Sequence, residues 1–529
     1  MTNDSVTFRI FQKTQVFQTK TRLEIDEMMS SAPNEEMFDI TLIGGGISGS
    51  FLALNILRKW RTARIAIIER SVEFQQKPGE SLSDMSGLIL GRMDLDHILK
   101  KHPEKTGLRF FFNETNTGAF AESAEFSSPS LRSVTNGFHI NRKLFDQQML
   151  DEVAALGAII FRPAEILEVT AKEFENVIQF SQENYNRQIR SRWIVDASGR
   201  ARFMHRKMGW TDIPVQLKTS SIFAHFTGVL PRSEWNLPTS PYWNQNAIGA
   251  DDFSTIHLMR PSAWWWFIRI DEVTTSVGIV FDHNALPYDE AEEFFNQRIR
   301  EDGTLTFILS NAKRGPVQEL KQLAYCSEKF YSKGIVLAGD SAAFVDPLVS
   351  PGIEMILQQS LWLADLLVAD GSDGQFNEAR WNRYEKIFRQ AYLDRCTIYT
   401  LAYPLMHSYD LMKNWLRMAL FSYFGLTVFL AVILPPLQKK PVVMNRAEGL
   451  ALGYFNWRQV RIKNRRTREH RISVYQPGEM SFSTVYVSRG AKVFLIPLRM
   501  FLMWFSDYVA LEWKEIRIRF GKKSKPDSQ

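Results

Sequence analysis

The sequence predicts an α/β protein built on a Rossmann-type domain, with an inserted β-sheet domain and a mainly helical C-terminal region. Three observations predict this fold: a strand–glycine loop–helix–strand unit at residues 38–70, alternating apolar and polar residues between about 215 and 315, and a largely helical pattern from about 366 onward. Strands and helices that alternate and then separate in this way are typical of layered α/β domains with an added module.

The glycine loop is the most informative segment. Phe38 to Ile43 is a short apolar run of strand type, residues 44–49 fit G-x-G-x-x-G, and an apolar helical pattern follows. A second apolar strand, residues 64–68, ends at Glu69, which lies 20 residues after Gly49. Strand, helix, strand and acid occur in the order of a dinucleotide-binding βαβ unit.

Each residue of this unit has a physical reason. Gly44 permits the tight turn, Gly46 lets the backbone approach a pyrophosphate, and Gly49 lets the helix pack against the strand. Free N–H groups at the helix start hold phosphate oxygens, and the Glu69 carboxylate accepts hydrogen bonds from a ribose. The predicted cofactor contacts of the unit are Gly44, Gly46, Ser48, Gly49, Glu69 and Arg70.

Composition sets the protein class. The chain has 529 residues, of which 45% are hydrophobic, so two or three globular domains are expected. Two cysteines, Cys326 and Cys396, provide no disulfide framework and indicate a reducing, cytoplasmic location. Residues 1–36 mix charges without an apolar core and are expected to form a loose extension rather than a secretory signal. No nucleic-acid-binding module is visible, so nucleic acid is not expected as a partner.

The domain limits follow from these patterns. We expect the dinucleotide-binding domain at residues 37–214, the β-sheet substrate domain at 215–315, and a return to the first domain at 316–365. Residues 366–529 form the helical C-terminal region, which faces a membrane or a partner in one interpretation. A helix from Lys143 to Leu156 is expected to bury Leu144, Met149, Val153 and Ala154.

Further motifs carry a family resemblance. Residues 196–199 (Asp-Ala-Ser-Gly) and the pair Gly339 and Asp340 each end an apolar strand, and Arg142 precedes a helix. Together with the glycine loop, they resemble the FAD-dependent oxidoreductases of the aromatic hydroxylase superfold over roughly residues 37–365. The resemblance implies an FAD/NAD(P)-binding Rossmann-type domain that binds FAD, with Arg142, Gly339, Asp340 and Gly352 at the cofactor.

Three finer features are similar to flavin-dependent halogenases. Residues 344–352 match F-x-D-P-x-x-S-x-G, residues 79–82 match a G-E-S-L turn, and residues 264–268 match W-x-W-x-I. Arg269 stands where that family has a proline, and tryptophan-rich strands are also common in plain cores. In that family, FAD supplied in reduced form by a separate flavin reductase reacts with oxygen and oxidises chloride or bromide to hypohalous acid.

The same resemblance assigns the halide site and the catalytic residue. Ser350 and Gly352 are expected to bind the halide, whereas Pro351 between them has no N–H to offer. Val349 stands where tryptophan-specific relatives have a glutamate, which favours a phenol, a pyrrole or another electron-rich ring over tryptophan. Lys105 matches the family lysine that guides hypohalous acid to the substrate.

Lys105 has a competing interpretation as a solvated surface lysine, because Lys100 and Lys101 lie close by. An ordinary lysine has a pKa of about 10.4, so the amine can act as a nucleophile near neutral pH only where burial lowers that value. Burial equally favours a hydrogen-bonding role for the ammonium group. The sequence leaves both roles open.

The C-terminal third contains two apolar stretches, Met418 to Leu437 and Val493 to Ala510, beside a basic run from Arg458 to Arg471. One interpretation is a helical subdomain with a solvated basic face. A second is a surface that lies on an anionic membrane or carries a greasy substrate, and a third is a transmembrane span. The basic run also fits docking of an acidic acyl-carrier protein.

The sequence therefore predicts an FAD-dependent halogenase that acts on an electron-rich aromatic or a carrier-bound or lipid-like precursor. Two alternatives stay open at this point. The chain fits an FAD-dependent monooxygenase or polyprenyl-reductase-like oxidoreductase, which shares Gly339 and Asp340, and it fits a membrane-associated flavoprotein without a working halide site.

Overall fold

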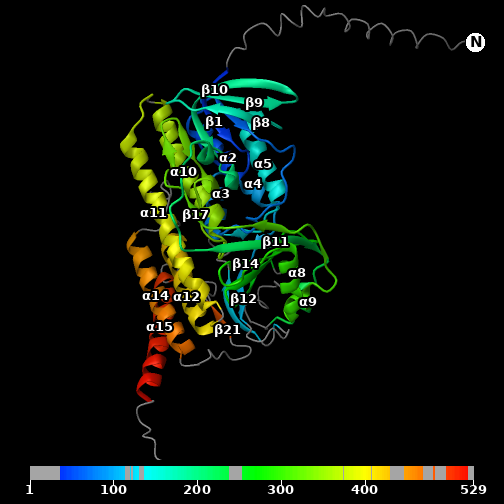
Figure 1. The fold of residues 1–529 in the computed structure, drawn as a ribbon, viewed down its shortest axis with the longest axis vertical. Helices are drawn as coiled ribbons and strands as arrows, with labels where there is room; N and C mark the ends of the chain where they lie inside the picture. The colour runs from blue at the N-terminus through cyan, green and yellow to red at the C-terminus, as the bar shows by residue number, and fades with distance from the viewer. Residues whose placement is uncertain are drawn as a thin grey trace, which may run out of the picture.

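The computed structural model is an elongated molecule in which two sheets lie one above the other and long helices run along one side (Figure 1). The structure describes residues 36–112, 120, 123–129, 136–237, 253–372, 374–406, 408–428, 446–468, 480–482 and 496–521. The expected N-terminal extension therefore lies outside the described residues, as do residues 429–437 of the first apolar C-terminal stretch.

The first sheet is the predicted Rossmann-type layer. Its strand order is β18-β19-β10-β1-β2-β7, and β1, β2, β7, β10 and β19 run parallel. The strands are β1 (Glu36–Ile43), β2 (Ile65–Ile68), β7 (Ile159–Phe161), β10 (Tyr185–Asp196), β18 (Tyr331–Ser332) and β19 (Ile335–Leu337). A hairpin of β8 (Glu165–Thr170) and β9 (Asn176–Gln182) extends it through β10. The glycine loop after β1 and the Gly-Asp pair after β19 consequently lie at the same edge, where ligands of such sheets bind.

Helices cover this sheet. Helix α2 (Ile47–Lys59) packs against both α5 (Arg142–Ala155) and α10 (Pro351–Ser372). Met149 and Val153 of α5 are buried as predicted, but Leu144 is 44% exposed and Ala154 is exposed, so those two predictions are wrong. The prediction assumed that apolar side chains alone fill the buried face of α5. In the structure that face also contains the charged pair Arg142 and Asp146, so its apolar part is narrower than predicted.

The second sheet has the strand order β15-β11-β14-β13-β12-β4-β5-β21. Its strands are β4 (Gly107–Phe112), β5 (Ala124–Pro129), β11 (Thr219–Thr227), β12 (Thr255–Arg260), β13 (Ala263–Arg269), β14 (Thr274–Asp282), β15 (Lys313–Arg314) and β21 (Met480–Phe482), with β16 (Gln318–Leu320) also paired to β11. The second sheet thus also contains strands that lie before residue 215 and after residue 315, the predicted limits of the β-sheet domain. The reason is pairing in space, because β4 lies parallel to β12 although some 150 residues separate them.

The two faces of the second sheet explain its tryptophans. Side chains alternate along a strand, so Trp264 and Trp266 face the large core shared with the first sheet. Trp265 and Phe267 face a smaller core under α8 (Ala291–Glu301) and α9 (Gly303–Ile308). Both faces are covered, which is why β13 is a continuous aromatic run rather than an alternating one.

Short elements connect the two sheets. They are α3 (Asp84–Arg92), α4 (Asp96–Leu99), α6 (Phe203–Lys207), and the small strand pairs β3 (Glu104–Lys105) with β6 (Gly137–Phe138) and β17 (Tyr325–Cys326) with β20 (Ala343–Phe344). Cys326 and Cys396 are buried free thiols.

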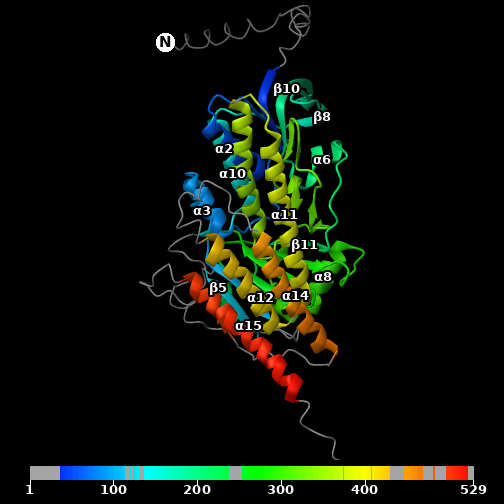
Figure 2. The same cartoon turned by 90° about the vertical axis from the view of Figure 1, so that its left-hand side faces the viewer.

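The C-terminal helices lie along one side of both sheets, as the two views show (Figures 1 and 2). They are α11 (Glu378–Ala402), α12 (Tyr409–Leu420), α14 (Arg446–Arg468) and α15 (Ile496–Gly521), with a π-helical segment at Phe421–Val428. Within the described part of the chain, one helix is long and apolar enough to cross a membrane, Pro351–Gly371 in α10, and 67% of its apolar window is buried. That segment is the helix that packs against α2 in the core.

Candidate active site

The three motif glycines of the first loop differ in what surrounds them. Gly44 has φ +104°, and a Cβ there would lie 2.6 Å from the Ala197 carbonyl oxygen. A Cβ on Gly49 would lie 2.0 Å from the Gly44 carbonyl oxygen, so both glycines are required by the fold itself. A Cβ on Gly46 would meet nothing closer than 3.4 Å. The space in front of Gly46 is therefore available to a ligand.

Two further predicted contacts adjoin this loop. The Ser48 hydroxyl is buried and has no hydrogen-bond partner in the described structure. A Cβ added to Gly339 would lie 2.7 Å from the Ser48 hydroxyl oxygen. The Glu69 carboxylate accepts a hydrogen bond of 2.8 Å from the Gly45 N–H and others from Ser71. Ser48, Glu69 and Gly339 thus converge on the loop, while Arg70 is exposed just outside it.

A charged cluster that sequence reasoning missed borders the same space. Lys77 and Arg142 both pair with the buried carboxylate of Asp146, at 2.6 and 3.0 Å. Burial raises the pKa of Asp146, but the charges of Arg142 and Lys77 outweigh burial and hold that pKa below its usual range. Lys77 Nζ is also the atom nearest to a Cβ on Gly46. Neither Lys77 nor Asp146 belongs to a motif, so only their meeting in space identifies them.

The Gly-Asp pair meets the predicted halide turn at a small cavity. Asp340, Phe344, Pro351, Gly352 and Met355 are among the residues that line it, and it has room for about one water-sized sphere. Burial raises the pKa of Asp340 to about 6, against the opposing charges of Arg200, Arg142 and Lys77.

The turn at residues 349–350, next to the cavity-lining Pro351, is strained. Val349 and Ser350 both have φ +60°, a left-handed conformation that is rare for a branched side chain such as valine. The Asp346 carboxylate anchors the turn by accepting hydrogen bonds from the Leu348 N–H (3.0 Å) and the Tyr403 hydroxyl (2.7 Å). Strain of this kind gathers at ligand sites, where surrounding contacts hold it in place.

The tryptophan-rich strand is linked to this anchor. The indole N–H of Trp264 donates a hydrogen bond of 3.2 Å to the Tyr403 hydroxyl, which in turn donates to Asp346. Burial raises the pKa of Asp346 to about 6, although its hydrogen bonds oppose that rise. The W-x-W-x-I segment therefore supports the predicted halide turn through Tyr403, a residue that the sequence analysis did not single out.

Lys105 is the buried member of its lysine group. Its side chain is 3% exposed, whereas Lys100 and Lys101 are exposed. Its Nζ donates a hydrogen bond of 2.9 Å to the Ser81 hydroxyl, which also accepts one of 3.2 Å from the Ser350 hydroxyl. One hydroxyl group thus connects the predicted catalytic lysine to the predicted halide turn.

Burial lowers the pKa of Lys105 to about 8, and the opposing charge of Asp84 is the smaller influence. Burial, with the charge of Lys105, lowers the pKa of His257 to about 3. The neutral His257 ring stacks on Phe110, with centroids 4.2 Å apart, and lies near Trp264 at 5.4 Å. The lysine therefore lies within electrostatic range of the His257 ring, and a substantial fraction of its amine is uncharged just above neutral pH.

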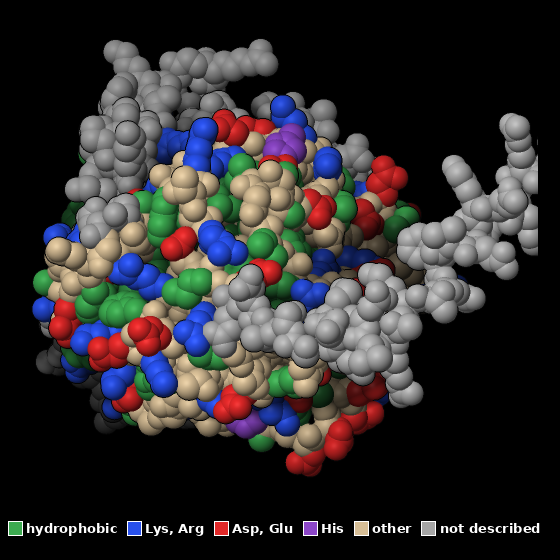
Figure 3. Space-filling model, turned by 90° about the horizontal axis from the view of Figure 1, so that it is seen from above, with side chains coloured by type: hydrophobic (Ala, Val, Ile, Leu, Met, Phe, Trp, Pro, Cys, Tyr) green, Lys and Arg blue, Asp and Glu red, His purple; other side chains and the backbone are tan. Residues whose placement is uncertain are grey.

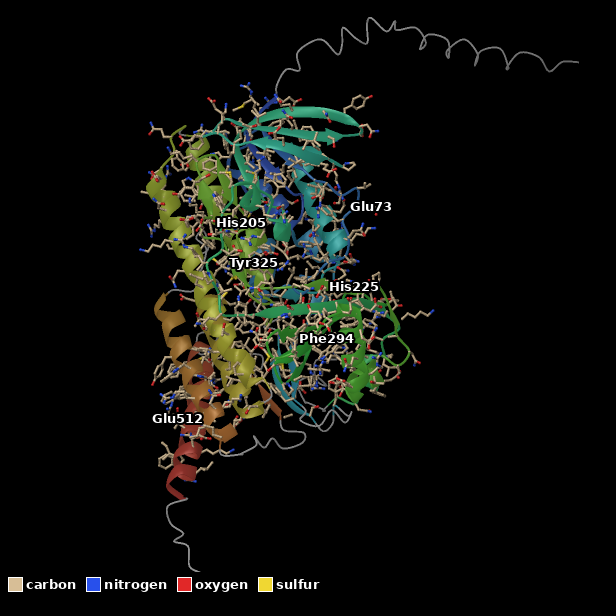
Figure 4. All side chains as sticks on the ribbon, in the orientation of Figure 1. Glu73, His205, His225, Phe294, Tyr325 and Glu512 are labelled. Carbon is tan, nitrogen blue, oxygen red and sulfur yellow. The ribbon has the colours of Figure 1, made fainter. Side chains whose placement is uncertain are left out.

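A second pair connects the G-E-S-L turn to the sheet. His225 on β11 lies where the two sheets meet (Figure 4), and its Nε2 is 2.6 Å from the Glu80 carboxylate. Burial lowers the pKa of His225, but Glu80 outweighs burial and the net shift is upward. This pair fixes the turn that carries Ser81.

Comparison with known proteins decides the family. A family profile described as tryptophan halogenase matches residues 106–404, more than half of the 529-residue chain. The chain belongs to the tryptophan halogenase family. It is an FAD-dependent halogenase that uses a halide, which resolves the monooxygenase, reductase and non-enzymatic alternatives in favour of halogenation.

Curated relatives of this halogenase span most of its length. It is 25% identical over 393 residues to a 1H-pyrrole-2-carbonyl peptidyl-carrier-protein chlorinase of Pseudomonas fluorescens, covering 70% of this chain and 84% of that protein. It is also 25% identical over 394 residues to the corresponding brominase of Pseudoalteromonas luteoviolacea, covering 72% and 89%.

Solved structures share the fold. The structure of halogenase PltM in complex with phloroglucinol and FAD superposes with a TM-score of 0.70 at 17% identity, covering 82% of this chain and 93% of that one. The flavin-dependent halogenase CmlS superposes with a TM-score of 0.59 at 19% identity, covering 90% and 78%. The predicted fold class is thereby confirmed.

The residues of this halogenase fit FAD. The open space at Gly46, the unpartnered Ser48 hydroxyl and the helix start behind them form a cradle for a pyrophosphate. Lys77 and Arg142 supply positive charge at its border. Gly339 and Asp340 lie between this cradle and the small cavity at Gly352.

Proposed function

We propose that this halogenase makes hypohalous acid beside the turn of Ser350 and Gly352, and that Lys105 passes it to an electron-rich aromatic ring. The observation that carries the proposal is the single hydroxyl, Ser81, that accepts hydrogen bonds from both Lys105 and Ser350. A species formed at the turn reaches the lysine without leaving a buried environment.

Each group in the site has one task. Bound FAD, when reduced, would activate oxygen, which is the oxidant for the halide. The Gly352 N–H holds the halide, because the Ser350 hydroxyl already donates its one proton to Ser81, while Asp346 keeps their turn in its strained form. Lys105 holds the hypohalous acid at Nζ, as a hydrogen-bond donor when charged or as a nucleophilic amine when neutral.

Electron-rich rings are the substrate class that the site supports. Val349 replaces the glutamate found in tryptophan-specific relatives, and His257, Phe110 and Trp264 provide aromatic surroundings for Lys105. Two similar enzymes act on a pyrrole carbonyl group held by a peptidyl carrier protein, and PltM has been crystallised with phloroglucinol. We infer a carrier protein as the substrate-bearing partner and a separate flavin reductase as the source of reduced flavin.

The mass of the product distinguishes halogenation from hydroxylation and from reactions that do not use halide. Purified enzyme, a flavin reductase and NADH would be incubated with pyrrole-2-carbonyl carrier protein, phloroglucinol and tryptophan, each with chloride or bromide. Halogenated pyrrole or phloroglucinol, with a mass shift that follows the halide, is the expected result. Hydroxylated products, or products that do not depend on halide, would contradict it.

We further propose that helix α15 rests on an anionic lipid surface, with the enzyme otherwise in the cytoplasm. Seven apolar side chains form one face of the helix at helical spacing, each 38–54% exposed. They are Leu498, Phe501, Leu502, Phe505, Val509, Trp513 and Ile516. A stripe this long, with one side of the helix packed on protein, is typical of helices that lie in a membrane interface.

The charged side chains of α15 are distributed as binding to an anionic lipid surface requires. All three acids turn inward: Asp507 pairs with Arg417, Glu512 with Arg458 and Glu515 with Arg466. Figure 4 shows Glu512 at the lower rim of the molecule, where α14 and α15 lie. The exposed charged side chains of the described part of α15 are Arg499, Lys514 and Arg517, all basic.

Arginines of the basic run partly neutralise α15 and α12, while Arg461 and Arg468 of the same run are exposed. The opposite end of the molecule, by contrast, has basic and acidic side chains interspersed (Figure 3).

A further inference from the structure

A chain of hydroxyl groups leads from Lys105 through Ser81 to a buried histidine. The Ser81 hydroxyl lies 3.1 Å from the Thr255 hydroxyl, and the Thr255 hydroxyl lies 2.8 Å from Nε2 of His139. Nδ1 of the same histidine lies 2.9 Å from the Arg269 carbonyl oxygen. Ser81, Thr255 and His139 are buried.

The carbonyl at the far end sets the direction of every hydrogen bond in the chain. A carbonyl oxygen only accepts, so Nδ1 of His139 carries a proton, and Nε2 of the neutral ring is an acceptor. Thr255 therefore donates to His139 and accepts from Ser81. The Ser81 oxygen, which accepts from Lys105 and Ser350, has one proton left, and that proton points to Thr255.

A hydroxyl can donate once and accept twice, and Ser81 uses all three of these capacities. The two ends of the chain are an ammonium group with protons to give and an imidazole nitrogen that accepts one. Imidazole is the side chain that changes charge near neutral pH. This is the arrangement of a proton wire.

We propose that Ser81 and Thr255 relay a proton from the Lys105 ammonium to Nε2 of His139, so that Lys105 meets hypohalous acid as an uncharged amine. The proposal rests on the proposed role of Lys105. One N–H bond breaks at Lys105 and one forms at Nε2, and each hydroxyl gives up its proton as it receives another. Lys105 ends neutral, His139 ends as an imidazolium, and no oxidant or reductant is consumed.

The surroundings favour this transfer over a direct exchange with water. Lys105 is 3% exposed, so solvent does not readily remove its proton. Among the described residues, the charged group that acts on it is Asp84 at the start of α3, and the neutral ring of His257 on β12 lies within range of its charge. Around His139, the Arg269 guanidinium lies over the Phe253 ring, which meets the His139 ring edge-on at 6.4 Å.

Backbone geometry holds the two ends of the relay in register. Ser81 and His139 form an isolated antiparallel bridge, flanked by the Leu82 N–H to Phe138 carbonyl hydrogen bond of 2.8 Å. Thr255 opens β12, next to β4, which begins two residues after Lys105. The relay therefore crosses from the G-E-S-L turn to the second sheet, and no sequence motif contains all of it.

The test uses Thr255→Val, which keeps the shape of the side chain and removes the hydroxyl. Bromination would be measured as product per reduced flavin, between pH 6.5 and 9.5, with the ring that the wild type brominates fastest among phenol, phloroglucinol and pyrrole. We expect Thr255→Val to lose at least about 10-fold near pH 7 and to recover toward wild type at pH 9.5, where hydroxide can deprotonate Lys105 directly. Thr255→Ser, which keeps the hydroxyl, should follow the wild-type profile.

His139→Gln keeps a polar group but cannot take up a proton, and it should share the high-pH recovery. Thr41→Val, the same isosteric change at a buried threonine of β1, controls for packing and should leave the profile unchanged. An unchanged profile in Thr255→Val, or a loss of equal size at every pH, would overturn the relay. Lys105→Ala separates the two proposals: if it is inactive at every pH while Thr255→Val is normal, only the relay fails, and if it halogenates normally, the role of the lysine fails as well.

Discussion

Replacing Gly46 by valine separates cofactor binding from folding. In the structure a Cβ at this position meets Lys77 Nζ at 3.4 Å and Asp146 Oδ2 at 3.6 Å, which are ordinary contacts. The side chain would instead fill the space through which the backbone approaches the pyrophosphate. One lost hydrogen bond to a charged phosphate costs ~1.5–3 kcal/mol, which corresponds to a loss of roughly 10- to 100-fold in FAD affinity for each contact.

The assay is the flavin absorbance of the purified protein, followed by FAD titration of the apoprotein and a thermal melt. We expect Gly46→Val to be colourless as purified yet to melt near the wild-type apoprotein, and Gly46→Ala to show a smaller loss of affinity. Gly49→Ala is the matched contrast, because its Cβ would lie 2.0 Å from the Gly44 carbonyl oxygen and should destabilise the fold by ~3 kcal/mol or more. A Gly46→Val protein with full yellow FAD content would refute the assignment of this loop.

Three further predictions concern the rest of the site and α15. Lys105→Ala should retain FAD and flavin reoxidation but lose substrate halogenation, whereas Lys100→Ala and Lys101→Ala should remain active, as product mass spectra would show. Tyr403→Phe removes a hydrogen bond to the buried Asp346 and should lower the free energy of unfolding in urea by ~1–3 kcal/mol; an unchanged midpoint would show that the turn does not depend on this anchor. The protein should sediment with anionic phosphatidylserine vesicles at low salt and be released as salt screens charges over ~10 Å at 0.1 M, while Phe505→Glu should stay in the supernatant. Binding to acidic carrier protein but not to vesicles would assign α15 to the carrier instead.

The glycine loop, the Gly-Asp pair and the F-x-D-P-x-x-S-x-G segment could be predicted from the sequence because their function depends on local backbone geometry. A tight turn, a helix start and a left-handed loop are encoded within a few residues, and the motif records them directly. For the same reason the two sheets could be anticipated from apolar periodicity. The predicted burial in α5 was less accurate, since the apolar Leu144 is exposed and the charged Arg142 is buried, which is the reverse of what hydrophobicity alone predicts.

Other features were decided by tertiary structure alone. Three lysines within six residues are equivalent in the sequence, and only the pairing of β3 with β6 buries Lys105 and leaves its neighbours in solvent. Lys77 and Asp146 come from different segments and meet beside Gly46. Thr255 and His139 lie more than a hundred residues apart, yet a hydrogen bond of 2.8 Å joins them. Hydrogen bonds and ion pairs depend on distances of about 3 Å, and chain order does not set such distances between segments that only the packing of two sheets brings together.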